Sequence, residues 1–154
     1  MKAILQRVSS AAVSVDGKTV GSCGNGFMIL FCAVDGDTVD DIDILAKKTV
    51  NLRVFRDEED KMNKSILDVD GEILAISQFT LAADVKKGNR PSFINALNPT
   101  DAENFYNIYC EKLLELGVKR VEKGVFGGDM DVTLTNSGPV TIAFDTDIWR
   151  KNGN

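Results

Sequence analysis

The segment ILAISQFTL, residues 73–81, predicts a strand that is buried at its start and polar at its end. Its first four residues are apolar at consecutive positions, which is typical of a strand covered on both faces. Alternation along a strand would place Ser77 with Phe79 on one face and Gln78 with Thr80 on the other. Buried hydroxyl and amide groups cost free energy unless they are paired, so this polar end is a candidate ligand site. An edge strand that turns toward solvent explains the same composition.

Further strands are predicted on both sides of this segment. Asp70-Gly71 favours a hairpin between residues 66–69 and 72–81, and Asp16-Gly17 favours another hairpin near the amino end. The remaining expected strands cover residues 2–15, 18–22, 27–34, 52–56, 118–123, 131–136 and 140–144. Strands thus outnumber helices by roughly eight to two.

Two helices are predicted between the strands. Asp37 or Thr38 can cap the first, whose apolar positions begin at Val39. Thr100-x-x-Glu103 is a capping box that opens the second, and Gly117 ends it. Its inward positions would be Phe105, Ile108, Tyr109, Leu113 and Leu116. Two helices cover one sheet face, so the chain is expected to be a single α+β domain, residues 1–154. It would hold two packed, barrel-like sheets with the helices on one side. The order of the tail at residues 146–154 is left open.

The 154 residues contain no histidine. That excludes Ser-His and Cys-His catalysis, histidine–metal sites and the usual neutral-pH general base. The cysteines, Cys23, Cys32 and Cys110, are odd in number and form no C-x-x-C pair, which favours small buried side chains in a reduced intracellular protein. No signal peptide or membrane span is evident, so a cytoplasmic location is expected.

The net charge of −5 is unevenly distributed. Nine of the 23 acidic residues lie in residues 35–43 and 57–60. The rest of the chain has 14 acidic and 18 basic residues, a net charge of +4. The acidic stretches lack the glycine and carboxylate spacing of a calcium loop, so no metal is expected. An acidic protein can still present a basic face to a polyanion.

Two further segments could carry chemistry. Gly138-Pro139 lies between two alternating strands, where proline cannot donate to a sheet ladder and breaks the pairing. A plain turn explains it equally, and its peptide bond could take either isomer. Lys86, Lys87 and Arg90, with Phe93 nearby, could hold phosphate and stack a base. A solvated charged loop is the alternative.

Six strings in this order resemble the signatures of D-aminoacyl-tRNA deacylases. They are MKAILQRVSSAAVSVDG (1–17), NLRVF (51–55), SQFTL (77–81), KGNRPSF (87–93), FGGDM (126–130) and NSGPVT (136–141). The resemblance runs from Met1 to about Asp145. Ala82 stands where family members commonly have an aromatic residue, and the tail after Asp145 has no clear counterpart.

The resemblance implies a hydrolase that removes D-amino acids, and glycine, from mischarged tRNA by cleaving the ester to the terminal adenosine. It implies a homodimer of three-layer β/β/α subunits that binds the acceptor end of aminoacyl-tRNA, without a cofactor, a metal, DNA or a membrane. Gly138-Pro139 would be cis and would enter the partner's site, reading the substrate amino group and excluding an L-side chain. Arg7 would brace it, and Met130 would contribute to substrate binding. Ser77, Gln78, Phe79 and Thr80 would line the catalytic pocket.

The residues themselves suggest how such a protein could work without histidine. Main-chain N–H groups near Phe79 and Thr80 could hold the developing oxyanion, while the 2′-hydroxyl of the substrate orients the water. Thr80 is a candidate nucleophile, but a threonine hydroxyl needs a base and the motifs offer none. Three alternatives stay open: a non-catalytic tRNA-end-binding module, a synthetase-associated editing domain, and a Thr- or Cys-dependent acyl hydrolase.

Overall fold

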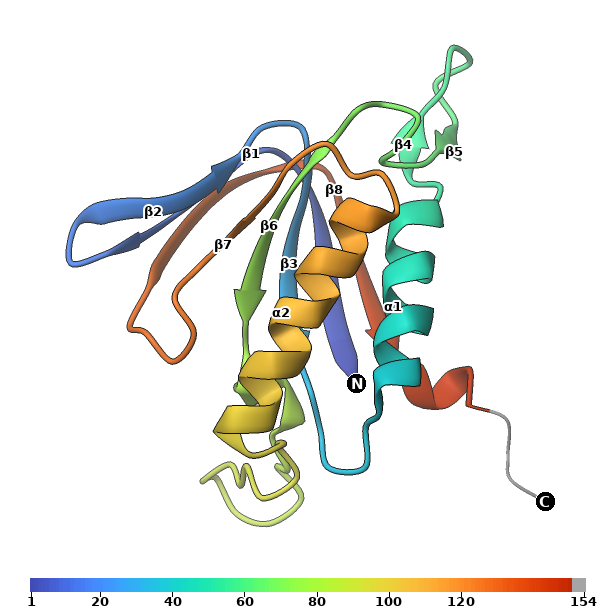
Figure 1. The fold of residues 1–154 in the computed structure, drawn as a ribbon. Helices are drawn as coiled ribbons and strands as arrows, with labels where there is room; N and C mark the ends of the chain where they lie inside the picture. Colours follow the sequence, from blue (N-terminus) through green and yellow to red (C-terminus); the bar gives the residue numbers. More distant parts are fainter. Residues whose placement is uncertain (151–154) are drawn as a thin grey trace.

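Strand β1 (Lys2–Val15) is the centre of the sheet, as the computed structural model of the protein shows in Figure 1. One edge of β1 pairs first with β3 (Gly26–Cys32) and then with β2 (Lys18–Cys23), both antiparallel. Its other edge pairs with the long antiparallel strand β8 (Asp131–Asp145). The structure describes residues 1–150.

Two parallel strands extend the sheet beyond β3. They are β6 (Glu72–Ser77), which pairs with β3, and β7 (Val121–Lys123), which pairs with β6. The predicted hairpin at Asp70-Gly71 is therefore wrong, and residues 66–69 form a turn. The Ser65 N–H donates to the Asp68 carboxylate at 2.9 Å, and the Gly71 N–H donates to the Ile66 carbonyl at 2.9 Å. Such local bonds give the backbone an alternative to a sheet ladder.

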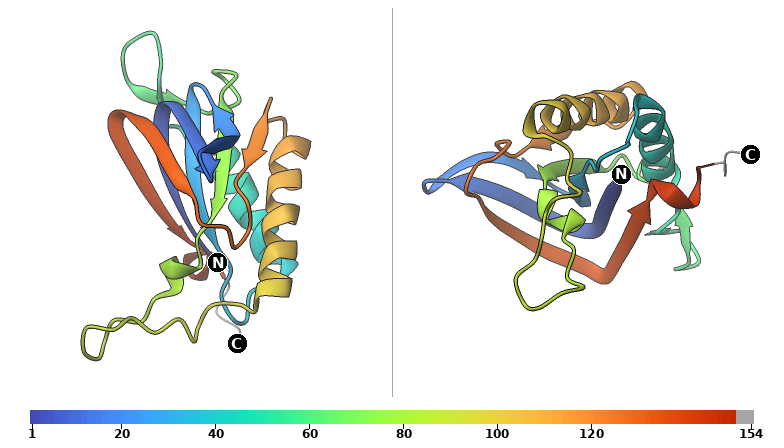
Figure 2. Two further views of the ribbon diagram at one scale, coloured as in Figure 1. Left: turned by 90° about the vertical axis from the view of Figure 1, so that its left-hand side faces the viewer. Right: turned by 90° about the horizontal axis from the view of Figure 1, so that it is seen from below.

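Both helices lie on one side of the sheet, α1 (Val39–Asn51) beside α2 (Pro99–Glu115), as Figure 2 shows. Of the two predicted caps, Asp37 and Thr38, it is Thr38 that caps α1. The predicted cap of α2 is two residues late, because Asn98 accepts from the Asp101 N–H at 3.0 Å and Pro99 occupies the first turn. Proline is tolerated there since its missing N–H would have no partner inside the helix.

The consecutive apolar residues of β3 and β6 are buried on both faces. Phe27, Ile29 and Phe31 pack toward the helices, in the larger core. Met28 and Leu74 pack on the opposite face, in a second core with β1 and, at its edge, β8. Figure 2 shows β8 on the side of the central strands away from the helices. The expected α+β class, with a barrel-like sheet and two helices on one side, is confirmed; its two sheet layers belong to one bent sheet.

The short strands differ from their predicted bounds. Only β4 (Phe55–Arg56) forms within residues 52–56, and it pairs with β5 (Met62–Lys64) in a small separate hairpin. Only β7 forms within residues 118–123. None of the helices in residues 1–150 has the length and apolar character needed to span a membrane.

The start of the predicted tail belongs to the folded domain. Residues Thr146–Ile148 form a short 3-10 helix, η2, and the buried Thr146 hydroxyl accepts from the amino group of Met1 at 2.9 Å. The same amino group pairs with Asp37, which also pairs with Arg150. The rest of the tail, residues 151–154, lies outside the described residues.

Candidate active site

Strand β6 ends at Ser77, directly before a one-turn 3-10 helix, η1 (Phe79–Ala82). The prediction of a strand through Leu81 is therefore wrong, and so is the assignment of Ser77, Gln78, Phe79 and Thr80 to alternating faces. The partner strand β3 ends at Cys32, so no ladder remains for the chain to follow. The Gln78 N–H donates to the Phe31 carbonyl at 2.7 Å and makes the last backbone bond between the two segments.

The first turn of η1 leaves main-chain donors free. The N–H groups of Leu81 and Ala83 bond to carbonyls within the turn. Those of Phe79 and Thr80 have no hydrogen-bond partner among residues 1–150, as is usual for the first N–H groups of a helix. Two adjacent donors are thus available to an external oxygen atom.

A cavity of about 630 Å³ opens beside this turn, enclosed by the ends of β3 and β6, the start of α2 and the loop before β8. Its walls are mostly apolar, and Phe93 meets the ring of Phe79 at 5.1 Å between centroids. The polar groups at its surface include Ser77, Gln78 and Asn98. Asp129 is the one charged residue among the described residues that line it.

Two side chains near the cavity resemble nucleophiles but lack activation. The Gln78 amide donates to the Thr80 hydroxyl, and an amide cannot take its proton. The buried Cys32 thiol bonds to the Phe79 carbonyl at 3.6 Å. Burial raises the pKa of Cys32 to about 11, so the group remains a thiol at neutral pH. Within residues 1–150, no three His, Cys, Asp or Glu side chains are grouped to hold a metal ion.

The Gly138-Pro139 peptide bulges out of the β8 ladder. Gln6 lies opposite Thr141 and Val8 opposite Asn136, so Arg7 alone faces residues 137–140. The predicted break in pairing is confirmed there, although Asp131–Asp145 continues as one strand instead of the expected two. Gly138 and Pro139 are exposed, and the bond between them is cis.

Arg7 fixes the base of this bulge. Its Nε donates to the Ser137 carbonyl at 2.8 Å, and its Nη1 donates to the Val54 carbonyl at 2.5 Å. The side chain is buried, and burial together with the nearby Arg56 lowers its pKa. A guanidinium remains charged even so, because its ordinary pKa is above about 12.

The candidate residues fall into separate places. Ser77, Gln78, Phe79, Phe93 and Met130 line the 630 Å³ cavity. Thr80 lies beside that cavity and is exposed. Arg7 and Gly138 line a different cavity, so the chain does not bring its Gly138-Pro139 bulge to its own pocket.

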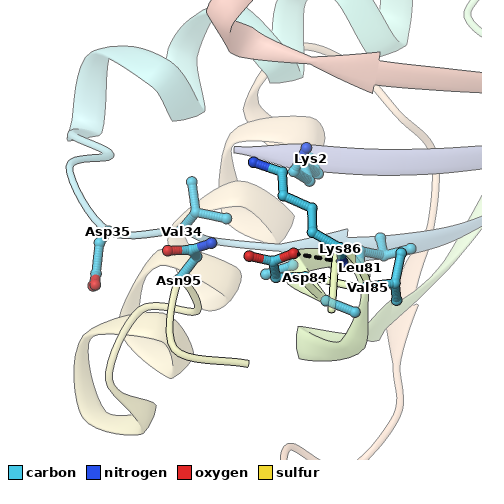
Figure 3. A pocket seen from close by; sticks show the side chains of 10 residues that line it. Lys2, Val34, Asp35, Leu81, Asp84, Val85, Lys86 and Asn95 are labelled. Atoms are coloured by element: carbon cyan, nitrogen blue, oxygen red, sulfur yellow. Dashed lines mark hydrogen bonds between the residues drawn. The ribbon is translucent and has the colours of Figure 1, made fainter. Parts of the chain in front are cut away.

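The predicted basic contacts lie on the loop between η1 and α2, which projects from the domain in Figure 2. Lys86, Lys87 and Arg90 are exposed on this loop. Lys86 lines a hollow of about 460 Å³. Figure 3 shows its side chain together with those of Lys2, Asp84 and Asn95. The carboxylate of Asp84 accepts from the Lys86 N–H at 2.9 Å, and Asp35 also lines the hollow. Two lysines and two aspartates make its lining close to neutral.

The sequence motifs missed several cavity walls. Phe31 comes from β3, and Asn98 and Ala102 from the start of α2. Apolar core residues and helix caps of this kind occur in every domain, so nothing in the local sequence identified these three as part of a site. They join the site only because β3 and β6 end, and α2 begins, at the same edge of the molecule.

Comparisons with known proteins agree over nearly the whole chain. A family model described as D-Tyr-tRNA(Tyr) deacylase matches residues 4–145. The D-aminoacyl-tRNA deacylase of Clostridium novyi (strain NT) is 51% identical over 146 residues, which cover 95% of this chain and 97% of that protein.

Two solved structures are also similar. The c-Myc DNA Unwinding Element Binding Protein is 41% identical, with a TM-score of 0.89 over 94% of this chain and 98% of that chain. A structure described as "Structural Analysis of a probable eukaryotic D-amino acid tRNA deacylase" is 20% identical, with a TM-score of 0.79 over 93% of this chain and 97% of that one, and supports the fold alone.

Proposed function

The chain belongs to the D-Tyr-tRNA(Tyr) deacylase family, and we propose that the 630 Å³ cavity is where it hydrolyses D-aminoacyl-tRNA. The protein is a D-aminoacyl-tRNA deacylase, a hydrolase that acts on the ester between a D-amino acid and tRNA. The volume lies within the range of ligand pockets, about 300–1,000 Å³, and the few polar groups stand among apolar walls as such pockets require. The substrates include mischarged glycine, and the reaction takes place in the cytoplasm.

The free N–H groups of Phe79 and Thr80 hold the oxyanion that forms when water attacks the ester carbonyl. Both groups stand at the start of η1, next to the cavity, and neither has a partner among residues 1–150. Donors fixed before the reaction stabilise the charge without reorganising, and one such donor typically contributes about 10²–10³ in rate.

The attacking water is oriented by the substrate, because the side chains of η1, Phe79–Ala82, include no general base. The chain has no histidine, and the Thr80 hydroxyl is bonded to an amide. The 2′-hydroxyl of the terminal adenosine can both donate and accept a hydrogen bond, and it is present in every tRNA. The aminoacyl ester is already activated, so modest acid–base assistance suffices.

Chiral selection is made in trans, in a homodimer. The observation that supports this arrangement is that Gly138 and Pro139 are exposed and absent from the lining of the chain's own cavity. In a two-fold symmetric dimer each protomer lends the same residues to the other. The bulge of one protomer then fills the space of an L-side chain in the partner's cavity and leaves the D-side chain free, which gives broad side-chain tolerance.

A direct assay separates this function from its alternatives. Purified protein is incubated with D-Tyr-tRNA and with L-Tyr-tRNA, and the ester is followed with time. D-selective loss is expected. Loss of neither ester identifies a tRNA-end-binding module, and loss of both identifies a general acyl hydrolase.

Mixed dimers test the in-trans arrangement. Ala102→Phe blocks the cavity, Gly138→Ala disables the bulge, and each variant alone should be inactive. Random mixing of the two restores about a quarter of the wild-type active sites, because half of the dimers are mixed and each holds one intact pair. Mass spectrometry verifies that mixed dimers have formed. If they recover no activity, the bulge acts in its own subunit's site and the proposal is contradicted. A monomer by sedimentation at micromolar concentration also contradicts the proposal.

A further inference from the structure

A second cavity, of about 390 Å³, lies behind the Gly138 bulge and is lined by positive side chains. Its lining consists of Arg7, Asn25, Phe55, Arg56, Val69, Ser137 and Gly138. No acidic residue of the described chain lines it. We propose that this cavity binds a phosphate group between the guanidinium groups of Arg7 and Arg56.

Arg7 is a buried cation without a counterion among residues 1–150. Its side chain is 5% exposed and donates to the neutral carbonyls of Ser137 and Val54. No carboxylate of residues 1–150 forms an ion pair with it. Burial of an ion is costly unless an opposite charge compensates it, so the site favours an anion.

One nitrogen of Arg7 is free to take such an anion. Its Nη2 has no hydrogen-bond partner among the described residues, while Nε and Nη1 are both used. The same Nη2 lies next to Gly138, where an added Cβ would stand 2.8 Å from it. Gly138 lines the cavity too, so the unused donor is on the cavity side of the bulge.

Arg56 supplies the second positive charge. Its only ion pair among residues 1–150 is with Asp60 at 3.3 Å, and the two side chains are 59% and 78% exposed. An exposed ion pair of this kind contributes little to stability, so Arg56 can readily leave Asp60 for another anion. Arg56 lies close enough to Arg7 for the repulsion between the two positive charges to lower the pKa of Arg7 further. A bound anion would relieve that repulsion.

The remaining walls suit an oxyanion. Asn25 offers an amide donor, and Phe55 and Val69 form the apolar side of the cavity. Two guanidinium groups match the several oxygens of phosphate better than they match a single small halide, because each presents a planar fork of donors.

Titration with inorganic phosphate tests the proposal on the full-length protein. The Nε resonances of Arg7 and Arg56 and the amide of Gly138 are followed by NMR, with sodium chloride at equal ionic strength as the reference. Saturable shifts in phosphate alone are expected. Arg56→Gln should weaken phosphate binding about tenfold, since it removes a charge-assisted hydrogen bond.

Arg53→Gln is the matched control, because Arg53 is exposed on the same segment and does not line the cavity. Equal phosphate affinity in the two variants, or shifts that chloride reproduces, overturns the proposal. Competition by a single-stranded RNA that ends in CCA identifies the RNA backbone as the source of the phosphate. Binding of inorganic phosphate without such competition identifies a free phosphate ligand. None of these readouts depends on ester hydrolysis, so the deacylase assay can fail or succeed independently.

Discussion

The Nε of Arg7 donates to the carbonyl oxygen of Ser137 at 2.8 Å and joins residues that are 130 positions apart. This bond spans the point where β8 leaves its ladder with β1, directly before Gly138. The position of the bulge is therefore set by a side chain of the neighbouring strand. Three predictions follow from this geometry and from the turn at η1, and a fourth concerns Asp41 at the start of α1.

Removing the Arg7 donors should destabilise the protein. In Arg7→Met the half-buried carbonyl of Ser137 and the buried carbonyl of Val54 lose their donors, so the free energy of unfolding should fall by about 2 kcal/mol. A misplaced bulge should also slow D-Tyr-tRNA hydrolysis by about 10²-fold. Urea unfolding and single-turnover kinetics measure the two effects. Arg53→Met, at an exposed position, should change neither.

Gly138→Ala should abolish D-aminoacyl-tRNA hydrolysis. Gly138 has a φ of 129°, and a Cβ would stand 2.8 Å from Arg7 Nη2 and 3.1 Å from Val140 Cγ2. Gly17→Ala is the control, since its φ is 76° but nothing lies within 4 Å of its Cβ. That change should cost about 1–2 kcal/mol of stability and leave the rate unaltered. Wild-type activity in Gly138→Ala would show that the bulge has no part in the site.

Thr80→Val should retain most of the deacylation rate. The hydroxyl is paired with the Gln78 amide, which cannot act as a base, while the main-chain N–H of residue 80 is kept in the variant. We expect a loss within about tenfold, below the effect of removing an oxyanion donor. Rates on D-Tyr-tRNA are compared with those of Thr19→Val, an exposed threonine on β2. A near-complete loss in a folded Thr80→Val protein would indicate covalent catalysis by Thr80.

Asp41→Asn should reduce stability at neutral pH and have little effect in strong acid. Burial tends to raise the pKa of Asp41, but the bonds from Arg150, Thr38 and Thr146 outweigh it and lower that pKa. A carboxyl with a lowered pKa stabilises the fold above its unfolded value, near 4, and this stability is lost as the pH falls through the folded value.

The expected loss for Asp41→Asn at pH 7 is about 1 kcal/mol, because the residue also completes the capping box of α1. Urea unfolding between pH 7 and pH 3 measures how the difference from wild type shrinks. Asp40→Asn, an exposed neighbour in the same helical turn, is the control. A loss that does not change with pH would contradict the role of the Asp41 charge.

Much of the fold could be predicted because its signals are local. The alternation of residues 2–15, the apolar run of β3 and the capping of α1 by Thr38 each depend on neighbours within a few positions. The resemblance of SQFTL and of the segment around Gly138-Pro139 to deacylase signatures could also be recognised from the sequence. The cap of α2 was misplaced because both Asn98 and Thr100 are good caps, and only the observed bond to Asp101 decides between them.

The sequence by itself therefore determined both helices, most of the strands and which of the strands are buried on both faces. The tertiary structure decided that β6 pairs in parallel with β3 and stops at Ser77, where its partner ends. It also decided that Gly138 stands apart from its own chain's cavity, with Arg7 behind it. Strand partners and buried charges join residues far apart in the chain, so no local pattern records them, and only the packing of β1, β3, β6 and β8 fixes their positions.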